Sequence, residues 1–323
     1  MTEGEPIEQP TLPPRDADGH KGTFGTVVVV GGCAAREATM LGAPTLTARA
    51  ALRAGAGLAK LALPAPLLLP ALELLPSATA VGLPVDVHDR VVPHLAAETL
   101  DDALASADAV VIGPGLGPTD HAGPAVESMT LRVLSQREIP VVVDADALNV
   151  LASMTGFSRE IQASSIFTPH PGEFARLAKP LNITHDPKDP ATRSTACEAM
   201  AQRLGVVCVL KGSKTVVSDG QRTWTCDRGH ACLATGGTGD VLGGVIASLV
   251  AQFVAPGPQM IGSIKMPKPP GKPLDLFDAA RLGVLAHAIA GENWATSHDA
   301  SAGLLATELT DELPAALESL RAK

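Results

Sequence analysis

Four short apolar runs alternate with alanine-rich stretches along most of this chain. The runs are TVVVV (26–30), DAVVIG (108–113), PVVVDAD (140–146) and VVCVL (206–210). Each is continuously apolar, as expected for strands buried on both faces of a sheet. Helical stretches are predicted over residues 42–55, 122–136, 145–153, 190–204, 238–252, 278–296 and 302–320. The pattern predicts an α/β fold: a single domain with a doubly wound, mainly parallel sheet and helices on both faces.

Glycines and polar residues follow directly after each apolar run. The four ends read GG (31–32), GPGLG (113–117), DADALN (144–149) and KGSKT (211–215). In parallel sheets, ligands bind beyond the carboxyl ends of the strands. The P-loop pattern G-x-x-x-x-G-K-[ST] is absent, and GPGLG lacks the third glycine of a dinucleotide fingerprint. The sequence therefore predicts a nucleotide site assembled from several strand ends.

The stretch LATGGTGDVLGG (233–244) places five glycines around one carboxylate, Asp240, just before a long apolar run. It is typical of a helix N-terminus, where free backbone N–H groups and the helix dipole favour an anion such as phosphate. Asp240 would make sense there as a general base that accepts a proton from a hydroxyl attacking the phosphate. The alternative is that Asp240 only stabilises the first turn of the helix.

Composition excludes several function classes. Among 323 residues, aromatic residues make up 2% with no Tyr, and the net charge is -9, which together argue against nucleic-acid binding. Five cysteines without a C-x-x-C pair favour neither disulfides nor zinc, and indicate a reducing cytoplasm. The most apolar run, residues 61–72, has three prolines and is too short to span a bilayer, so no membrane association is expected.

Two segments depart from the α/β rhythm. Residues 1–20 are acidic and proline-rich without a signal-peptide core, so we expect a flexible lead-in before one domain at 21–323. Residues 254–276 contain six prolines and are predicted to be a surface insertion between two helices, without regular structure.

Seven blocks, in this order, resemble the ADP-dependent (S)-NAD(P)H-hydrate dehydratases of the ribokinase-like superfamily. They are HKGTFGTVVVVGG (20–32), GAPTLTARAALRAGAGLAKLALP (42–64), VIGPGLG (111–117), PVVVDADALNVL (140–151), TPHPGEFARL (168–177), LKGSKTVV (210–217) and LATGGTGDVLGGVIASLVAQ (233–252). The resemblance runs from about residue 20 to the C-terminus. Two features depart from it: the insertion at 254–276 is longer than expected, and no epimerase domain precedes the blocks.

The resemblance implies a repair enzyme that uses ADP to return hydrated NADH or NADPH to the normal dinucleotide, with release of AMP and phosphate. Asp240 would be the base that deprotonates the hydroxyl of the hydrated ring. Lys211, Gly212, Ser213, Lys214 and Thr215 would hold the AMP part of ADP, with Gly239 at its phosphates. Ala43, Gly115, His170 and Asp240 would line the hydrated dinucleotide. Gly236, Gly237, Thr238 and Gly239 would form an anion hole, and Glu173 would help to position Mg²⁺.

Simpler interpretations exist for several of these residues. His170 could fill a turn, Asp144 or Asp146 could cap a helix, and Lys211 and Lys214 could be surface charges. His287 lies in an apolar helix and is expected to be a core histidine. No activated thiolate is indicated at Cys226 or Cys232.

Two rival functions stay open at this stage. One is a kinase of the same superfamily acting on a vitamin precursor such as hydroxymethylpyrimidine or hydroxyethylthiazole. The other is a nucleotide-binding regulatory module without catalysis, against which an intact Asp240 argues. The resemblance suggests a homo-oligomer such as a tetramer, and the choice between NADHX and NADPHX is open.

Overall fold

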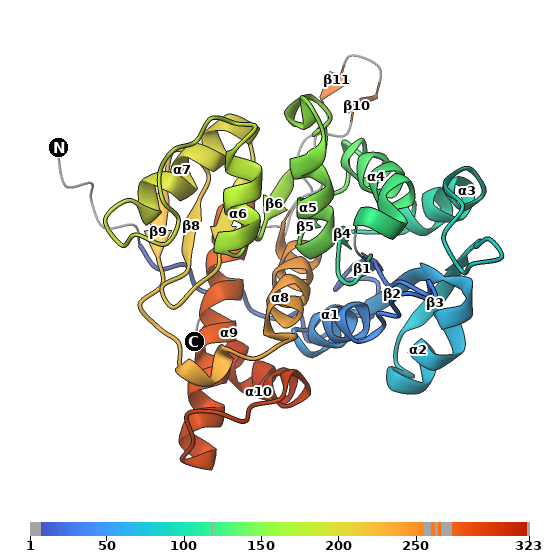
Figure 1. Cartoon of the computed structure of the whole chain (residues 1–323). Helices are drawn as coiled ribbons and strands as arrows, with labels where there is room; N and C mark the ends of the chain where they lie inside the picture. The colour runs from blue at the N-terminus through green and yellow to red at the C-terminus, as the bar shows by residue number, and fades with distance from the viewer. Residues whose placement is uncertain (1–7, 118, 255–259, 262–263, 266–272, 322–323) are drawn as a thin grey trace.

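The structure, a computed structural model, describes residues 8–117, 119–254, 260–261, 264–265 and 273–321. The strands in them are β1 (Thr26–Val30), β2 (Leu58–Pro64), β3 (Thr79–Leu83), β4 (Ala109–Ile112), β5 (Val141–Val143), β6 (Ser165–Phe167), β7 (Val207–Leu210), β8 (Val216–Ser218), β9 (Thr223–Thr225), β10 (Met260–Ile261) and β11 (Ile264–Lys265). β1 to β9 form one sheet in the order β3-β2-β1-β4-β5-β6-β7-β8-β9 (Figure 1). Neighbours from β3 to β7 are parallel, whereas β8 and β9 are antiparallel additions at one edge. The mainly parallel sheet is confirmed.

Helices cover both faces of the sheet, as predicted. One face carries α1 (Gly42–Arg53), α2 (Leu68–Leu74), α8 (Thr238–Phe253), α9 (Leu276–His298) and α10 (Ala306–Ser319). The other carries α3 (Pro93–Leu104), α4 (Thr119–Leu134), α5 (Ala145–Ser153), α6 (Pro171–Ala178) and α7 (Arg193–Leu204). Alternate valines of β1 belong to two separate core clusters, Val27 and Val29 to the first and Val28 and Val30 to the second. This alternation explains why the strand is apolar at every position.

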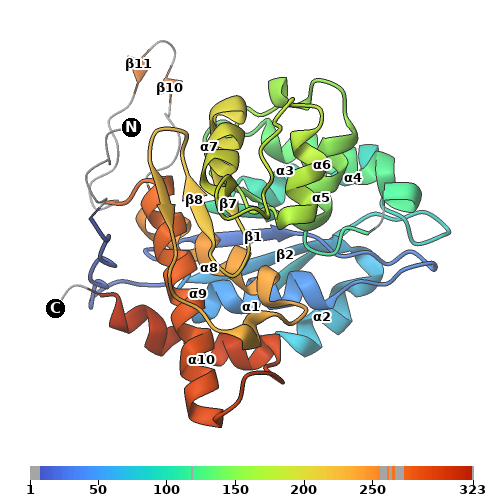
Figure 2. The same cartoon turned by 60° about the vertical axis from the view of Figure 1, so that its left-hand side comes forward.

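Helix α8 is the centre of the first face, between α1 and α9 (Figure 2). All its residues from Val241 to Phe253 are buried. A Cβ at Gly244 would lie 2.2 Å from the carbonyl oxygen of Thr47, so the backbones of α1 and α8 touch there. Gly244, one of the five glycines around Asp240, is therefore needed for helix packing rather than for a ligand.

The predicted flexible lead-in differs from the structure from residue 8 onward. Leu12 is buried, and its N–H donates to the carbonyl of Leu320 at 2.8 Å. The guanidinium of Arg15 stacks over the ring of Phe24. Apolar and cationic side chains within a proline-rich segment thus fix it to the domain; residues 1–7 lie outside the described part.

Most of the predicted proline-rich insertion also lies outside the described residues. The segment follows α8 and precedes α9 in the chain. Its described parts include a bridge between Val254 and Leu274 and the short antiparallel pair β10–β11, so the expectation of no regular structure was wrong for these residues. In the described part of the chain, no helix combines the length and apolar character required for a membrane span.

Candidate active site

Four chain segments meet at the carboxyl ends of the neighbouring strands β5, β6 and β7. Asp144 follows β5, Glu173 lies in the first turn of α6 after β6, and Lys211 follows β7. Asp240 lies in the first turn of α8. Because β5, β6 and β7 are parallel neighbours, their ends bring together residues that are far apart in sequence.

Lys211 is the centre of a buried ion-pair cluster. Its Nζ lies 2.6 Å from Asp144 Oδ1 and 3.8 Å from Glu173 Oε2. The side chains of Asp144 and Glu173 are only 2% and 6% exposed. Burial lowers the pKa of Lys211, but the two carboxylates outweigh burial and raise that pKa above its ordinary value. Lys211 is therefore a fixed cation within the site, not a surface charge.

Asp144 has the structural role that the simpler interpretation gave it. Its Oδ1 accepts the N–H of Ala145 at 2.9 Å and caps α5. The same carboxylate also binds Lys211, so it joins the end of β5 to the end of β7. One residue thus serves both the helix and the cluster.

Asp240 has a strongly shifted pKa. Burial is the main cause, the negative charge of Asp144 adds to it, and Lys211 opposes it; the net effect raises the pKa of Asp240 to about 7. Burial raises the pKa of Glu173 to about 7 as well, against the charge of Lys211. A carboxyl group with a pKa near neutrality is a good general base for a reaction near pH 7.

The glycine loop before Asp240 offers free donors. Helix α8 begins after Gly237, whose φ of 90° favours glycine, and no side chain caps this N-terminus. In the described chain the N–H groups of Gly239 and Asp240 have no acceptor, because the first helical bond is donated by Val241 to Gly237. The Thr238 hydroxyl instead donates within the loop, to the carbonyls of Leu233 and Thr235. The predicted anion hole therefore has the local geometry of an anion site.

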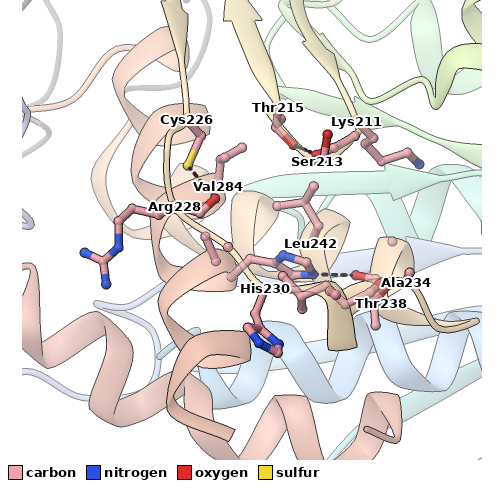
Figure 3. Close-up of a pocket in the computed structure, with 17 residues that line it drawn as sticks. Lys211, Ser213, Thr215, Cys226, Arg228, His230, Ala234, Thr238, Leu242 and Val284 are labelled. Atoms are coloured by element: carbon pink, nitrogen blue, oxygen red, sulfur yellow. Dashed lines mark hydrogen bonds between the residues drawn. The ribbon is translucent and has the colours of Figure 1, made fainter. Parts of the chain in front are cut away.

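A cavity of about 470 Å³ opens beside this loop (Figure 3). This volume lies in the range of small-molecule sites. Cys226, Leu242, Val284 and Ala288 give it apolar walls. The predicted residues that line it are Lys211, Gly212, Ser213, Thr215, Thr238 and Gly239.

Three predicted site residues do not line this cavity, and one residue predicted for the core does. Lys214 is exposed and does not line the cavity, although its four neighbours in KGSKT do. Gly236 and Gly237 lie in the loop but outside the lining. His287 was expected in the core, yet it lines the cavity and hydrogen-bonds to the carbonyl of Thr238 at 2.8 Å. The apolar helix around His287 gave no signal of this position.

Ala43 and Gly115 lie together, outside the lining of this cavity. A Cβ at Gly115 would lie 3.5 Å from that of Ala43. Leu116, next to Gly115, lines a second cavity of about 300 Å³ at the ends of β1, β2 and β4. Asp146 holds this region to the first turn of α5, since its Oδ2 accepts the N–H of Gly117 at 2.9 Å. The two cavities thus lie at opposite parts of the same sheet edge.

His170 caps α6. Its Nδ1 accepts the N–H of Gly172 at 2.9 Å, while the carboxylate of Glu173 accepts the N–H of His170 at 2.8 Å. Burial and the charge of Lys211 lower the pKa of His170, which keeps the ring available as an acceptor. The interpretation as a turn residue is therefore sufficient for its position, and contact with a substrate stays a prediction.

The side chains present do not form a metal cage by themselves. Across the residues that the structure describes, no group of three or more His, Cys, Asp or Glu side chains is arranged to hold a metal ion. Glu173 accepts a backbone N–H with one oxygen and approaches His170 with the other at 3.3 Å. Mg²⁺ in nucleotide enzymes is bound mainly by phosphate oxygens and water, with one or two carboxylates. The role of Glu173 in positioning Mg²⁺ therefore stays a prediction.

Strand order, helix layers and a site at the carboxyl edge define a ribokinase-like α/β protein. A ribokinase-like protein of Enterococcus faecalis has the same fold, with a TM-score of 0.71, 23% identity and coverage of 96% of this chain and 93% of that one. An ADP/ATP-dependent NAD(P)H-hydrate dehydratase of Bacillus subtilis, co-crystallised with ATP and Mg²⁺, has a TM-score of 0.73 at 30% identity, over 96% and 95% of the two chains.

The chain belongs to the NAD(P)H-hydrate dehydratase family, whose sequence model matches residues 27–315. It is 36% identical to the ADP-dependent (S)-NAD(P)H-hydrate dehydratase of Neisseria meningitidis, over 91% of this chain and 86% of that protein. It is 35% identical to the bifunctional NAD(P)H-hydrate repair enzyme of Moorella thermoacetica over 96% of this chain. The chain spans about half the length of such bifunctional relatives, 52% in that case. The family named from the seven blocks is confirmed.

Proposed function

We propose that this chain dehydrates (S)-NADHX and (S)-NADPHX to NADH and NADPH, consuming ADP and releasing AMP and phosphate. One observation carries the proposal. Asp240, with a pKa of about 7, lies in the first turn of a helix whose free N–H groups border a nucleotide-sized cavity. A hydroxyl held there would meet a base and an anion site together.

ADP would occupy the larger cavity. The apolar wall of Cys226, Leu242 and Val284 would contact the base, and Gly212, Ser213 and Thr215 would hold the AMP part. Lys211 and the N–H of Gly239 would meet the phosphates, since a Cβ on Gly239 would lie 3.5 Å from Lys211 Nζ. The hydrated dinucleotide would lie over Ala43 and Gly115 and extend toward the second cavity.

The reaction would proceed in two steps. Asp240 accepts the proton of the ring hydroxyl as the hydroxyl oxygen attacks the terminal phosphorus of ADP, and AMP leaves as the bond to the bridging oxygen breaks. The lone pair of the ring nitrogen then expels the phosphorylated oxygen as phosphate, and loss of a proton from the neighbouring ring carbon restores the reduced ring. The oxygen added by hydration therefore leaves in phosphate rather than in water.

The residues around Asp240 would stabilise the charges that develop. Lys211 and the N–H groups of Gly239 and Asp240 offer fixed positive charge and dipoles to the transferring phosphoryl group. Mg²⁺ on the phosphates would neutralise their oxygens. The buried, unpaired cysteines agree with a reducing cytoplasm, and we propose a homo-oligomer there.

A turnover assay tests the proposed function. Purified protein is mixed with (S)-NADHX, Mg²⁺ and either ADP or ATP, and the absorbance of the reduced nicotinamide is followed. We expect recovery with ADP. No recovery with either nucleotide, together with phosphorylation of hydroxymethylpyrimidine or hydroxyethylthiazole, would replace the dehydratase with the rival kinase.

A further inference from the structure

His287, on α9, contacts the glycine loop where α8 begins. Its Nε2 lies 2.8 Å from the carbonyl oxygen of Thr238, and the residue also lines the larger cavity. A carbonyl oxygen can only accept, so Nε2 carries the proton and donates it to this bond. The bond to the Thr238 carbonyl therefore fixes the tautomer of His287 that has its proton on Nε2.

The accepting carbonyl belongs to a particular peptide unit. The C=O of Thr238 and the N–H of Gly239 are parts of the same planar group and point in opposite directions across a trans peptide. A bond that His287 donates to the carbonyl therefore helps to orient the N–H at the opposite edge of the peptide unit, and polarises this N–H toward stronger donation. That N–H is one of the two free donors of the loop.

Thr238 and Gly239 are the first two residues of α8, so this peptide unit has helical geometry and the carbonyl of Thr238 is also an acceptor within the helix. Gly237 and Gly239 flank Thr238 and lack the side chains that restrict rotation. No side chain caps α8, and the hydroxyl of Thr238 is used for the carbonyls of Leu233 and Thr235. The imidazole on α9 adds a second donor to this carbonyl from outside α8, and so anchors a first turn that no capping side chain holds.

Burial lowers the pKa of His287 to about 4, and the charge of Lys211 contributes in the same direction. The ring is therefore neutral near pH 7. It acts there as a hydrogen-bond donor and not as an acid.

We propose that His287 is a positioning residue of the anion hole, which aims the N–H of Gly239 at the phosphoryl group of ADP through the carbonyl of Thr238. The role in turnover rests on the proposed function, whereas the role in phosphate binding does not. Removal of an anion-hole donor lowers turnover by about a hundredfold to a thousandfold. Because here a donor is misoriented and not removed, we expect His287→Leu to lower kcat by about tenfold to a hundredfold.

Three variants separate the hydrogen bond from the volume of the side chain. His287→Gln places an amide N–H near the position of Nε2 and should restore most of the lost kcat. His287→Asn carries the same amide one methylene shorter and should behave like His287→Leu. Melting temperatures show whether each variant is folded. If the Leu variant does not fold, the Asn variant is compared with the Gln variant instead.

A binding measurement provides the second readout. Calorimetry gives the affinities for ADP and for adenosine, and their ratio reports recognition of phosphate. We expect the ratio to fall by about threefold to tenfold in the Leu and Asn variants, through loss of ADP affinity alone. An unchanged ratio, equal loss for adenosine, or a Gln variant as impaired as the Leu variant would each overturn the proposal. If the wild-type protein showed no turnover, the proposed function would fail and this ratio would still decide the role of His287.

Discussion

Asp240→Asn should lower kcat by about two to four orders of magnitude, the range expected for loss of a general base. Asparagine keeps the size of the side chain but cannot accept the proton of the ring hydroxyl. The affinity for ADP, measured by calorimetry, should stay near the wild-type value, because Lys211 and the free N–H groups of the loop remain. Asp299→Asn, the same change at the C-terminal end of α9, is the control and should keep wild-type turnover.

The pH dependence of turnover checks the same assignment. Asp240 must be ionised to accept a proton, so kcat/KM should rise with pH through about 7 in the wild-type protein and then level off. The small remaining activity of the Asn variant should lack this rise. Wild-type turnover in Asp240→Asn would remove the residue from the mechanism.

Asp240→Asn should raise the stability of the protein at high pH, although it lowers turnover. The pKa of Asp240 is higher in the folded state than in the unfolded chain, so its favourable contribution is present below pH of about 4 and is lost as the pH rises through about 7. Asp240→Asn removes this penalty. Its melting temperature should therefore exceed that of the wild-type protein at pH 8 and match it at pH 4.

Lys211→Met should lower both stability and nucleotide binding. The variant leaves the buried carboxylate of Asp144 without its cation, which typically costs about 3 to 5 kcal/mol of the free energy of unfolding. It also removes a charge-assisted contact to phosphate, so we expect ADP affinity to fall by about tenfold to a hundredfold. Denaturant unfolding and calorimetry measure the two effects.

Lys214→Met provides the matched control for stability. Lys214 has the same side chain three residues away, is exposed, and forms no ion pair among the described residues, so its variant should unfold like the wild-type protein. In Lys211→Met the rise of kcat/KM should also move to higher pH, because Lys211 lowers the pKa of Asp240. Equal stability of the two variants would show that Asp144 does not depend on Lys211.

The sheet could be predicted because buried parallel strands leave a continuous apolar signal. All four predicted strands and seven predicted helices are present, with boundaries within a few residues for most of them. β8 and β9 were missed because they have three residues each and form an antiparallel edge. The apolar pattern did not predict β2, β3, α2 or α3, since prolines and short apolar runs in that region obscure the periodicity of helices and strands.

The site was predictable in its residues more than in its contacts. Asp240 and the glycine loop are visible in twelve consecutive residues, so local sequence indicates them. Lys211 and Asp144 are separated by 67 positions, and only the order of the strands brings them together. His287 could not be recognised, because its role depends on which loop its helix faces. The role of Gly244 could not be predicted from the sequence, since a close helix crossing requires glycine as much as a ligand does.

The fate of the hydration oxygen tests the central claim most directly. (S)-NADHX is prepared with a heavy oxygen isotope in the ring hydroxyl and converted with ADP, and the label is followed by mass spectrometry. If Asp240 promotes attack of that hydroxyl on ADP, the released phosphate carries the label and the water does not. Label in water, with unlabelled phosphate, would contradict phosphoryl transfer to the substrate and with it the proposed role of Asp240.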